Sequence, residues 1–255
     1  MSVDALRLAG GFLSVLPVRG VRDPDRRTAG RAMVLAPVAV LPLATLTGLV
    51  VLLAQLVVLP APVRAVLVVG VLALGTRAMH LDGLADTVDG LGASWDRDRA
   101  LAVMRRGDVG PMGAVALLVV LGLQVAALAA FPYVPGAALA VGLLVCGSRC
   151  ALVLVCRRGV PAARPDGLGQ VVAGSVGRTG VVVGTVLSTA LAAVAAVLVR
   201  QPWWQGVVAG LLAALVVLLL VRHTVRRLGG VSGDVMGAAV EVAFATLLVV
   251  LVAQP

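Results

Sequence analysis

Three aspartates lie within HLDGLADTVDG, residues 80 to 90, of a chain that is otherwise strongly apolar. If this segment is helical, at about 100° per residue, Asp82, Asp86 and Asp89 fall within an arc of roughly 60°. Carboxylates at this spacing repel one another, and a cation relieves the repulsion. Hard oxygen ligands suit Mg²⁺ or Mn²⁺, and Mg²⁺ is typically held by one or two carboxylates together with substrate phosphates. The spacing therefore predicts a Mg²⁺ site with Asp82, Asp86 and Asp89 as ligands.

The alternative is a solvated helix end whose acids serve solubility. A solvated face normally mixes residue types, whereas this one has three aspartates, no glutamate and the small neighbours Gly83 and Ala85. Small neighbours would let a bulky ligand approach. His80 points away from the aspartate stripe on the same helix. It is either a polar anchor or a direct catalytic or ligand residue, and the sequence leaves both open.

Two later segments contain arginines that could bind phosphate. MRRGDVGPMG contains Arg105 and Asp108 in a glycine-rich turn, where guanidinium groups and free backbone N–H groups suit phosphate oxygens. ARPDGLG contains Arg164 and Asp166 in a turn-rich loop, and loops often carry function. We predict substrate contacts at Arg105, Asp108 and Arg164, and a polar or metal-binding role for Asp166. A plain basic loop is the alternative for the first segment.

Charged residues also occur inside apolar runs. Arg149 in GSRC is about two turns inside an apolar segment, where an arginine either lines an internal site or extends to the interface. In GGVSGDVMGAAVE, Asp234, Gly237, Ala238 and Glu241 follow i, i+3, i+4, i+7. This spacing predicts a groove of small residues with a carboxylate at each end. We expect both carboxylates and Arg149 to contact substrate, with Glu241 facing Arg149 or the aspartates.

The composition shows which elements must position these residues. The chain has 255 residues, 60% hydrophobic and 13% charged, with a mean hydropathy of +1.08. Soluble domains have about 25% charged residues, so we predict an all-α, polytopic integral membrane helical bundle that forms one catalytic domain, residues 1–255. The net charge of +9 comes entirely from arginine. No aromatic-basic surface accompanies it, which argues against a nucleic-acid partner and leaves the lipid bilayer.

About seven transmembrane helices are expected. Residues 1–31 should form a cytoplasmic or interfacial N-terminal segment with a short helix, and Pro37 and Pro42 should kink the first span. The predicted spans are residues 32–59, 65–79, 114–131, 136–156, 180–199, 203–221 and 235–253.

Arginine-rich and arginine-poor connections alternate along the chain between these spans. Arginines crowd the N-terminal segment and every second connection, whereas the opposite connections hold only Arg64 and Arg200. The positive-inside rule then places the N-terminus in the cytoplasm and the C-terminus outside. Eleven of the twelve acidic residues fall in the same cytoplasmic segments. Because acidic residues contribute little to topology, their gathering predicts an active site on the cytoplasmic side.

Taken in order, the motifs resemble those of the cobalamin synthase (adenosylcobinamide-GDP ribazoletransferase) family. The matching stretches are FLSVLPV, HLDGLADTVDG, the VMR segment with its following glycines, SR, ARxxGLG and GGxSGDxxGAAxE. One departure is that the family usually has Met-Arg-Asp, where this chain has Met104, Arg105 and Arg106 with Asp108 two residues later.

The resemblance implies a bacterial inner-membrane transferase of a late step in cobalamin biosynthesis that uses Mg²⁺. It would join adenosylcobinamide-GDP to α-ribazole, or its 5′-phosphate, and release GMP. The residues suggest matching roles: a Mg²⁺ ion at the aspartates, Arg105 and Arg164 on phosphate oxygens, and Asp89 as proton acceptor. The sequence leaves open the oligomeric state, including a homo-oligomer, and the preferred form of ribazole.

Two other functions remain to be weighed. A lipid head-group phosphotransferase with a CDP-linked donor would use the same metal chemistry, but its aspartate motif is longer and has an Ala-Arg pair that this chain lacks. A secondary transporter would place its charged site near the midplane and often shows internal repeats. Here the acids are expected at one surface, and no clear repeat relates the halves.

Overall fold

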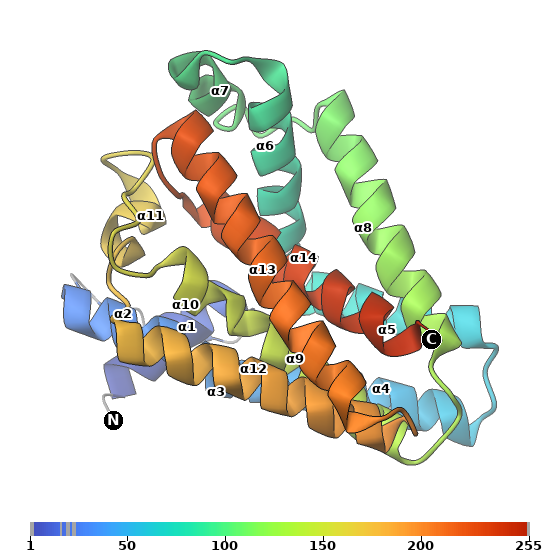
Figure 1. Ribbon diagram of the computed structural model, residues 1–255. Coiled ribbons are helices and arrows are strands. Elements are labelled where there is room, and N and C mark those ends of the chain that lie inside the picture. Colours follow the sequence, from blue (N-terminus) through green and yellow to red (C-terminus); the bar gives the residue numbers. More distant parts are fainter. Residues whose placement is uncertain (1–2, 16, 19–20, 22–23, 254–255) are drawn as a thin grey trace.

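The computed structural model describes residues 3–15, 17–18, 21 and 24–253, and all regular elements within them are helices (Figure 1). The predicted all-α class is confirmed. Arg19, Arg22 and Asp23, which belong to the predicted N-terminal segment 1–31, lie outside the described residues. The helices are α1 (Val3–Leu13), α2 (Arg26–Val34), α3 (Ala36–Ala39), α4 (Leu41–Leu56), α5 (Ala61–Gly75), α6 (Met79–Ala93), α7 (Arg97–Val103), α8 (Pro111–Ala130), α9 (Gly136–Arg149), α10 (Ala151–Val155), α11 (Gly167–Val172), α12 (Arg178–Leu198), α13 (Trp203–Leu228) and α14 (Gly233–Val252).

Five stretches of the described chain are long and apolar enough to cross a membrane: α8, α9 with α10, α12, α13 and α14. A sixth arises if α5 and α6 form one span bent by 88°. The first predicted span is divided into α2, α3 and the 16-residue α4, as its two prolines led us to expect. A polytopic helical membrane protein is therefore confirmed, with five or six clear spans rather than seven straight ones.

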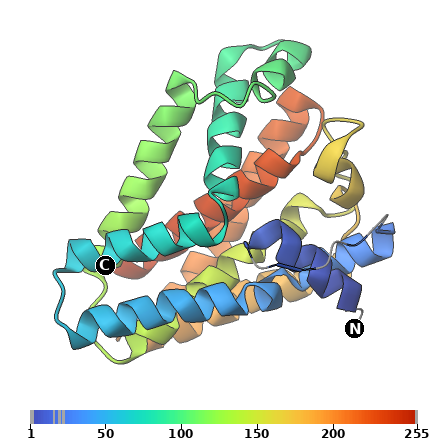
Figure 2. The same ribbon diagram turned by 180° about the vertical axis from the view of Figure 1, so that it is seen from behind.

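The connections separate into two groups in space. Figures 1 and 2 show the α4–α5 and α8–α9 loops and the C-terminus near one end of the molecule. The arginine-rich connections that follow α6, α10 and α13 lie toward the opposite end. This arrangement agrees with the alternation of arginine-rich and arginine-poor connections in the sequence. The N-terminal helix α1 packs against α2 and α3, so the short helix expected there exists and contacts the bundle.

The bend between α5 and α6 turns the aspartate helix into the bundle. Arg77 and Ala78 both adopt the left-handed conformation, with φ of 52° and 54°. For residues with a side chain this costs roughly 1–2 kcal/mol each, so surrounding packing must hold the turn. The N–H of Met79 donates to Thr76 O at 3.1 Å across it. The predicted span 65–79 therefore ends at Gly75, and α6 takes a new direction.

Helices α6 and α14 cross in close contact because glycine occupies both sides of the crossing. A Cβ atom on Gly83 would lie 2.6 Å from the carbonyl oxygen of Asp234. A Cβ on Gly237 would lie 2.9 Å from the Cα of His80. Any larger residue would push the helices apart. Helix α6 therefore packs against the groove of small residues predicted on α14. The crossing places the aspartates of α6 beside the start of α14.

Asp89 joins the start of α8 to α6. One carboxylate oxygen accepts a hydrogen bond from Gly110 N at 2.7 Å, and the other accepts one from Gly113 N at 2.8 Å. These donors belong to the first turn of α8, whose N–H groups have no partner within the helix. A negative charge is also favourable at a helix N-terminus. Asp89 therefore caps α8, and Gly113 leaves the space that its carboxylate occupies.

The connections that carry the other motifs are joined by backbone hydrogen bonds. Ala163 N donates to Val231 O at 2.9 Å, and Val231 N donates to Pro161 O at 3.0 Å. The Arg97 guanidinium ties both connections to α7, donating to Leu228 O and to Ala163 O, each at 2.9 Å. The ARPDGLG loop, the start of α14 and α7 thus form one connected region.

We predict that Gly83→Ala lowers the stability of the protein by roughly 1–3 kcal/mol, because the added methyl group overlaps the backbone of α14. Gly122→Ala is the matched control, since open space surrounds that glycine of α8. It should leave stability unchanged or raise it slightly. Thermal unfolding of detergent-solubilised protein measures both. Equal effects of the two substitutions would contradict the close crossing.

A second prediction concerns the cap of α8. Asp89→Ala should lower the free energy of unfolding by about 1–3 kcal/mol, because two backbone N–H groups lose their acceptor. Asp82→Ala on the same helix should change it by less than about 0.5 kcal/mol, since Asp82 is exposed. The same unfolding measurement applies. If Asp89→Ala is as mild as the control, the cap does not hold α8 in place.

Candidate active site

Asp82 and Asp86 of α6 interact electrostatically with Asp234 where α6 crosses the start of α14. Asp86 is buried, with 8% of its surface exposed, and Asp82 one turn earlier is exposed. Asp86 experiences repulsion from Asp82 and from Asp234, and attraction from Arg164. Asp234 accepts a hydrogen bond from Ser232 Oγ at 3.1 Å and lies 3.9 Å from Arg164 Nη1. The structure thus adds Asp234 to the two leading aspartates.

Asp89 has a different partner from its neighbours on α6. Both of its oxygens accept backbone hydrogen bonds from the start of α8. Its roles as third metal ligand and as proton acceptor would require those bonds to break, and both stay predictions. The three aspartates do share a face of α6. Within the described residues, the carboxylates of Asp82 and Asp86 accept no hydrogen bond, whereas that of Asp89 accepts two.

Mg²⁺ prefers oxygen ligands, and the carboxylates around Asp86 could supply them. Within the described residues, no three His, Cys, Asp or Glu side chains are arranged as a complete metal site. Mg²⁺ rarely needs such a cage, because one or two carboxylates and substrate phosphates usually hold it. Asp82 and Asp86 repel each other and accept no hydrogen bond from a described residue, so they fit a divalent ion shared with phosphate. Asp234 could join from α14.

An arginine-lined pocket lies next to these carboxylates. Its volume is about 400 Å³. Arg164 extends from it toward Asp234, and Arg105 lies 3.4 Å from both oxygens of Asp166 in an exposed ion pair. The pocket is lined by Arg97, Asp98, Leu101, Ala102, Arg105, Ala163, Arg164 and Pro165. The two arginines predicted to contact phosphate therefore share one pocket, although 59 positions of sequence separate Arg105 from Arg164.

Arg97 is a pocket residue that the sequence did not single out. Nothing distinguishes it from the other arginines of its segment, because its role depends on which loops meet at α7. Asp108, by contrast, was predicted from the sequence to contact substrate. It is exposed, and its carboxylate contacts no described residue. Asp108 lies two residues before Gly110, whose N–H donates to Asp89, and its substrate-binding role stays a prediction.

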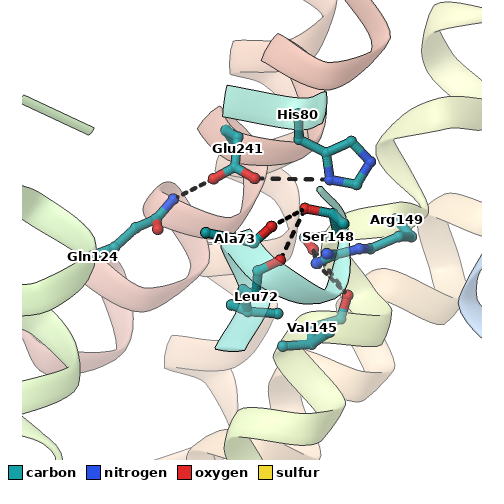
Figure 3. Close-up of polar contacts among 9 residues, drawn as sticks. Leu72, Ala73, His80, Gln124, Val145, Ser148, Arg149 and Glu241 are labelled. Carbon is teal, nitrogen blue, oxygen red and sulfur yellow. Dashed lines mark hydrogen bonds and ion pairs between the residues drawn. The ribbon is translucent and has the colours of Figure 1, made fainter. Parts of the chain in front are cut away.

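A second polar cluster is buried deeper between α6, α8 and α14 (Figure 3). The Glu241 carboxylate accepts a hydrogen bond from Gln124 Nε2 at 2.7 Å, and its other oxygen lies 3.8 Å from His80 Nδ1. His80 thus faces Glu241 rather than the aspartates, as its position on the helix predicts. Gln124 was missed, although a lone amide in the apolar run of α8 was a usable signal.

Arg149 belongs to this buried cluster. Only 2% of its surface is exposed, so it does not extend to the interface. Its guanidinium donates to Ser148 Oγ at 2.9 Å and to Val145 O at 3.2 Å, and it attracts Glu241 electrostatically. The contacts of Glu241 are with Gln124 and His80, and Arg149 interacts with it only electrostatically, so a direct pairing of Glu241 with Arg149 stays a prediction. Contact of these residues with substrate stays a prediction.

The arrangement is suited to a phosphate ester. Carboxylates for a divalent cation lie beside guanidinium groups that bind phosphate oxygens, and the buried Nε of Arg164 has no partner among the described atoms. A cation and arginines on two sides of a phosphorus atom stabilise the charge that develops during phosphoryl transfer. The site is therefore a candidate for phosphotransfer chemistry.

Comparison with known proteins identifies the family. The cobalamin-5-phosphate synthase family model matches residues 5–252. The chain is 49% identical over 246 residues to an adenosylcobinamide-GDP ribazoletransferase of Nocardioides sp., covering 96% of each chain. It is 42% identical over 264 residues to that of Frankia casuarinae, covering 98% of this chain and 95% of the relative. No solved structure gives a significant match. The chain belongs to the cobalamin-5-phosphate synthase family.

Proposed function

We propose that this protein is an adenosylcobinamide-GDP ribazoletransferase that joins adenosylcobinamide-GDP to α-ribazole or its 5′-phosphate and releases GMP. Its products would be adenosylcobalamin or the corresponding 5′-phosphate. The name of its relatives supports this activity over nearly the full chain. The observation that carries the chemistry is the group of Asp82, Asp86 and Asp234 beside an arginine-lined pocket.

A Mg²⁺ ion, when bound, would neutralise charge on the transferring phosphoryl group and on the GMP leaving group. Asp82 and Asp86 would hold it, with Asp234 as a further ligand. These side chains fit because they project from two helices in close contact and interact electrostatically across the crossing. Holding the ligands in advance reduces the reorganisation needed during reaction.

The arginines would orient the pyrophosphate of the corrinoid substrate. Arg164 lies between the pocket and Asp234, so its guanidinium can bind a phosphate oxygen next to the metal ligands. Arg105 would exchange its exposed ion pair with Asp166 for a second phosphate oxygen. Contacts from two guanidinium groups would hold the phosphorus in line with the attacking hydroxyl group.

The ribazole 5′-hydroxyl would attack the phosphorus next to the corrinoid side arm and lose its proton to a carboxylate. Asp89 would accept this proton only if one of its hydrogen bonds to the start of α8 breaks, because both of its oxygens accept hydrogen bonds from backbone N–H groups. Arg149, His80 and Glu241 lie in the buried cluster and would support the helices that carry the site.

The positive-inside rule supports a site on the cytoplasmic side of the bacterial inner membrane, because the arginine-rich connections form the same region as the aspartates. The corrinoid and ribazole substrates would then be drawn from the cytoplasm. A CDP-alcohol phosphotransferase is the second candidate, since the same metal chemistry would serve a CDP-linked donor. Membership of the cobalamin-5-phosphate synthase family favours the corrinoid substrate.

The activity is tested with purified protein, adenosylcobinamide-GDP, α-ribazole and Mg²⁺, by measuring GMP. We expect turnover that a chelator abolishes. Asp82→Asn and Asp86→Asn should each lower kcat at least about a hundredfold, since metal binding contributes several kcal/mol to transition-state stabilisation. Asp4→Asn, a change of the same charge at an exposed position in α1, is the control and should keep full activity.

Unchanged activity in both aspartate variants would remove the metal assignment while leaving the transferase in place. Turnover of a CDP-linked lipid donor without GMP release from the corrinoid donor would overturn the proposed function itself.

A further inference from the structure

A second arginine-lined pocket lies away from the candidate active site. It has a volume of about 950 Å³ and is formed where α2 packs beside the first turn of α12 (Figures 1 and 2). It shares no lining residue with the arginine pocket next to the aspartates. The lining residues are Arg26, Arg27, Gly30, Arg31, Val34, Leu35, Arg158, Gly174, Ser175, Val176, Gly177, Thr179 and Gly180.

The charges of this pocket are all of one sign. Four arginines line it, and none of its described lining residues is acidic. Arg26 donates to Ala173 O at 2.8 Å, whereas the side chains of Arg27, Arg31 and Arg158 donate to no other described residue. Asp25 attracts Arg27 and Arg31, but its carboxylate accepts the N–H of Thr28 as the cap of α2. Several guanidinium groups around one cavity repel one another, and a bound anion would relieve that repulsion.

Neutral hydrogen-bond donors line the same cavity. Gly177 caps α12 without a side-chain hydrogen bond, so the first N–H groups of this 21-residue helix face the pocket without a partner in the helix. A helix N-terminus favours an anion. The Ser175 hydroxyl is buried and has no partner among the described residues. Backbone donors, a free hydroxyl and arginines thus converge on one space.

The wall of the pocket is held in place by close packing. A Cβ on Gly30 of α2 would lie 2.5 Å from Ser175 O, so α2 contacts the loop before α12 directly. Gly174 in that loop has φ of +67°, which a residue with a side chain rarely adopts. The donors are therefore presented by a fixed surface.

We propose that this second arginine pocket binds a phosphate-bearing anion, either the headgroup of an anionic phospholipid or a soluble phosphate. The pocket is at the end of a candidate membrane span, and Val182 and Val183 on the next turn of α12 are exposed. A lipid could place its phosphate among the arginines and its chains along that apolar face, whereas inorganic phosphate needs the arginines alone. The proposal does not depend on the transferase reaction.

Binding is tested by calorimetric titration of the purified full-length protein in neutral detergent with three probes. These are dioctanoyl-phosphatidylglycerol, the zwitterionic dioctanoyl-phosphatidylcholine, and inorganic phosphate. The test variant is the double substitution Arg27→Gln and Arg31→Gln. The control is Arg222→Gln with Arg226→Gln, which removes two exposed arginines at the same spacing from α13.

We expect the wild type to bind phosphatidylglycerol or phosphate more tightly than phosphatidylcholine. The test variant should bind at least about tenfold more weakly, because charge-assisted hydrogen bonds are lost, and the control should stay within about twofold. Binding of phosphatidylglycerol alone assigns the pocket to an anionic phospholipid. Binding of inorganic phosphate assigns it to a soluble phosphate. GMP release should persist in the test variant, which separates this site from the active site. Failure of both anions to bind, or equal losses in the two double variants, would overturn the proposal.

Discussion

The close crossing of α6 and α14 is the constraint on which the candidate active site depends. Gly83 and Gly237 let two backbones meet, and this contact holds Asp82 and Asp86 beside Asp234 although their charges repel. Packing of uncharged groups thus opposes the electrostatic repulsion between the carboxylates. A site built this way gains binding energy when a cation arrives, because repulsion that the fold has already overcome is relieved.

Several charged side chains that are buried near the site have polar partners within the apolar bundle. Asp89 engages the N-terminus of α8, and Glu241 engages Gln124 and His80. Arg149 donates to one carbonyl and one hydroxyl oxygen of its own helix. Buried charges are costly unless they are paired, so the contacts of Asp89 and Glu241 join α6, α8 and α14 more specifically than apolar packing alone. These polar groups therefore serve the site by fixing its helices.

The sequence predicted the class of fold and proposed the residues of the candidate site, because both depend on local patterns. Apolar runs marked the spans, and the spacing of Asp82 and Asp86 marked one face of a helix. The bend at Arg77 and Ala78 was not predictable, because neither glycine nor proline occurs there and tertiary packing holds the strained turn. The sequence also placed Asp89 with the other aspartates, since spacing shows a shared helix face but not that α8 begins against it. Arg97 lines the arginine pocket because distant connections of the chain meet at α7, and the sequence does not show that meeting.

Metal binding tests the central claim most directly, because it needs no turnover. Mn²⁺ can be titrated into the purified protein in the presence of inorganic pyrophosphate and followed by electron paramagnetic resonance. The account predicts a protein-bound signal that weakens at least about tenfold when Asp82 and Asp86 are both replaced by asparagine. The same Mn²⁺ affinity in the wild type and in that double variant would show that the carboxylates at the crossing do not hold a cation.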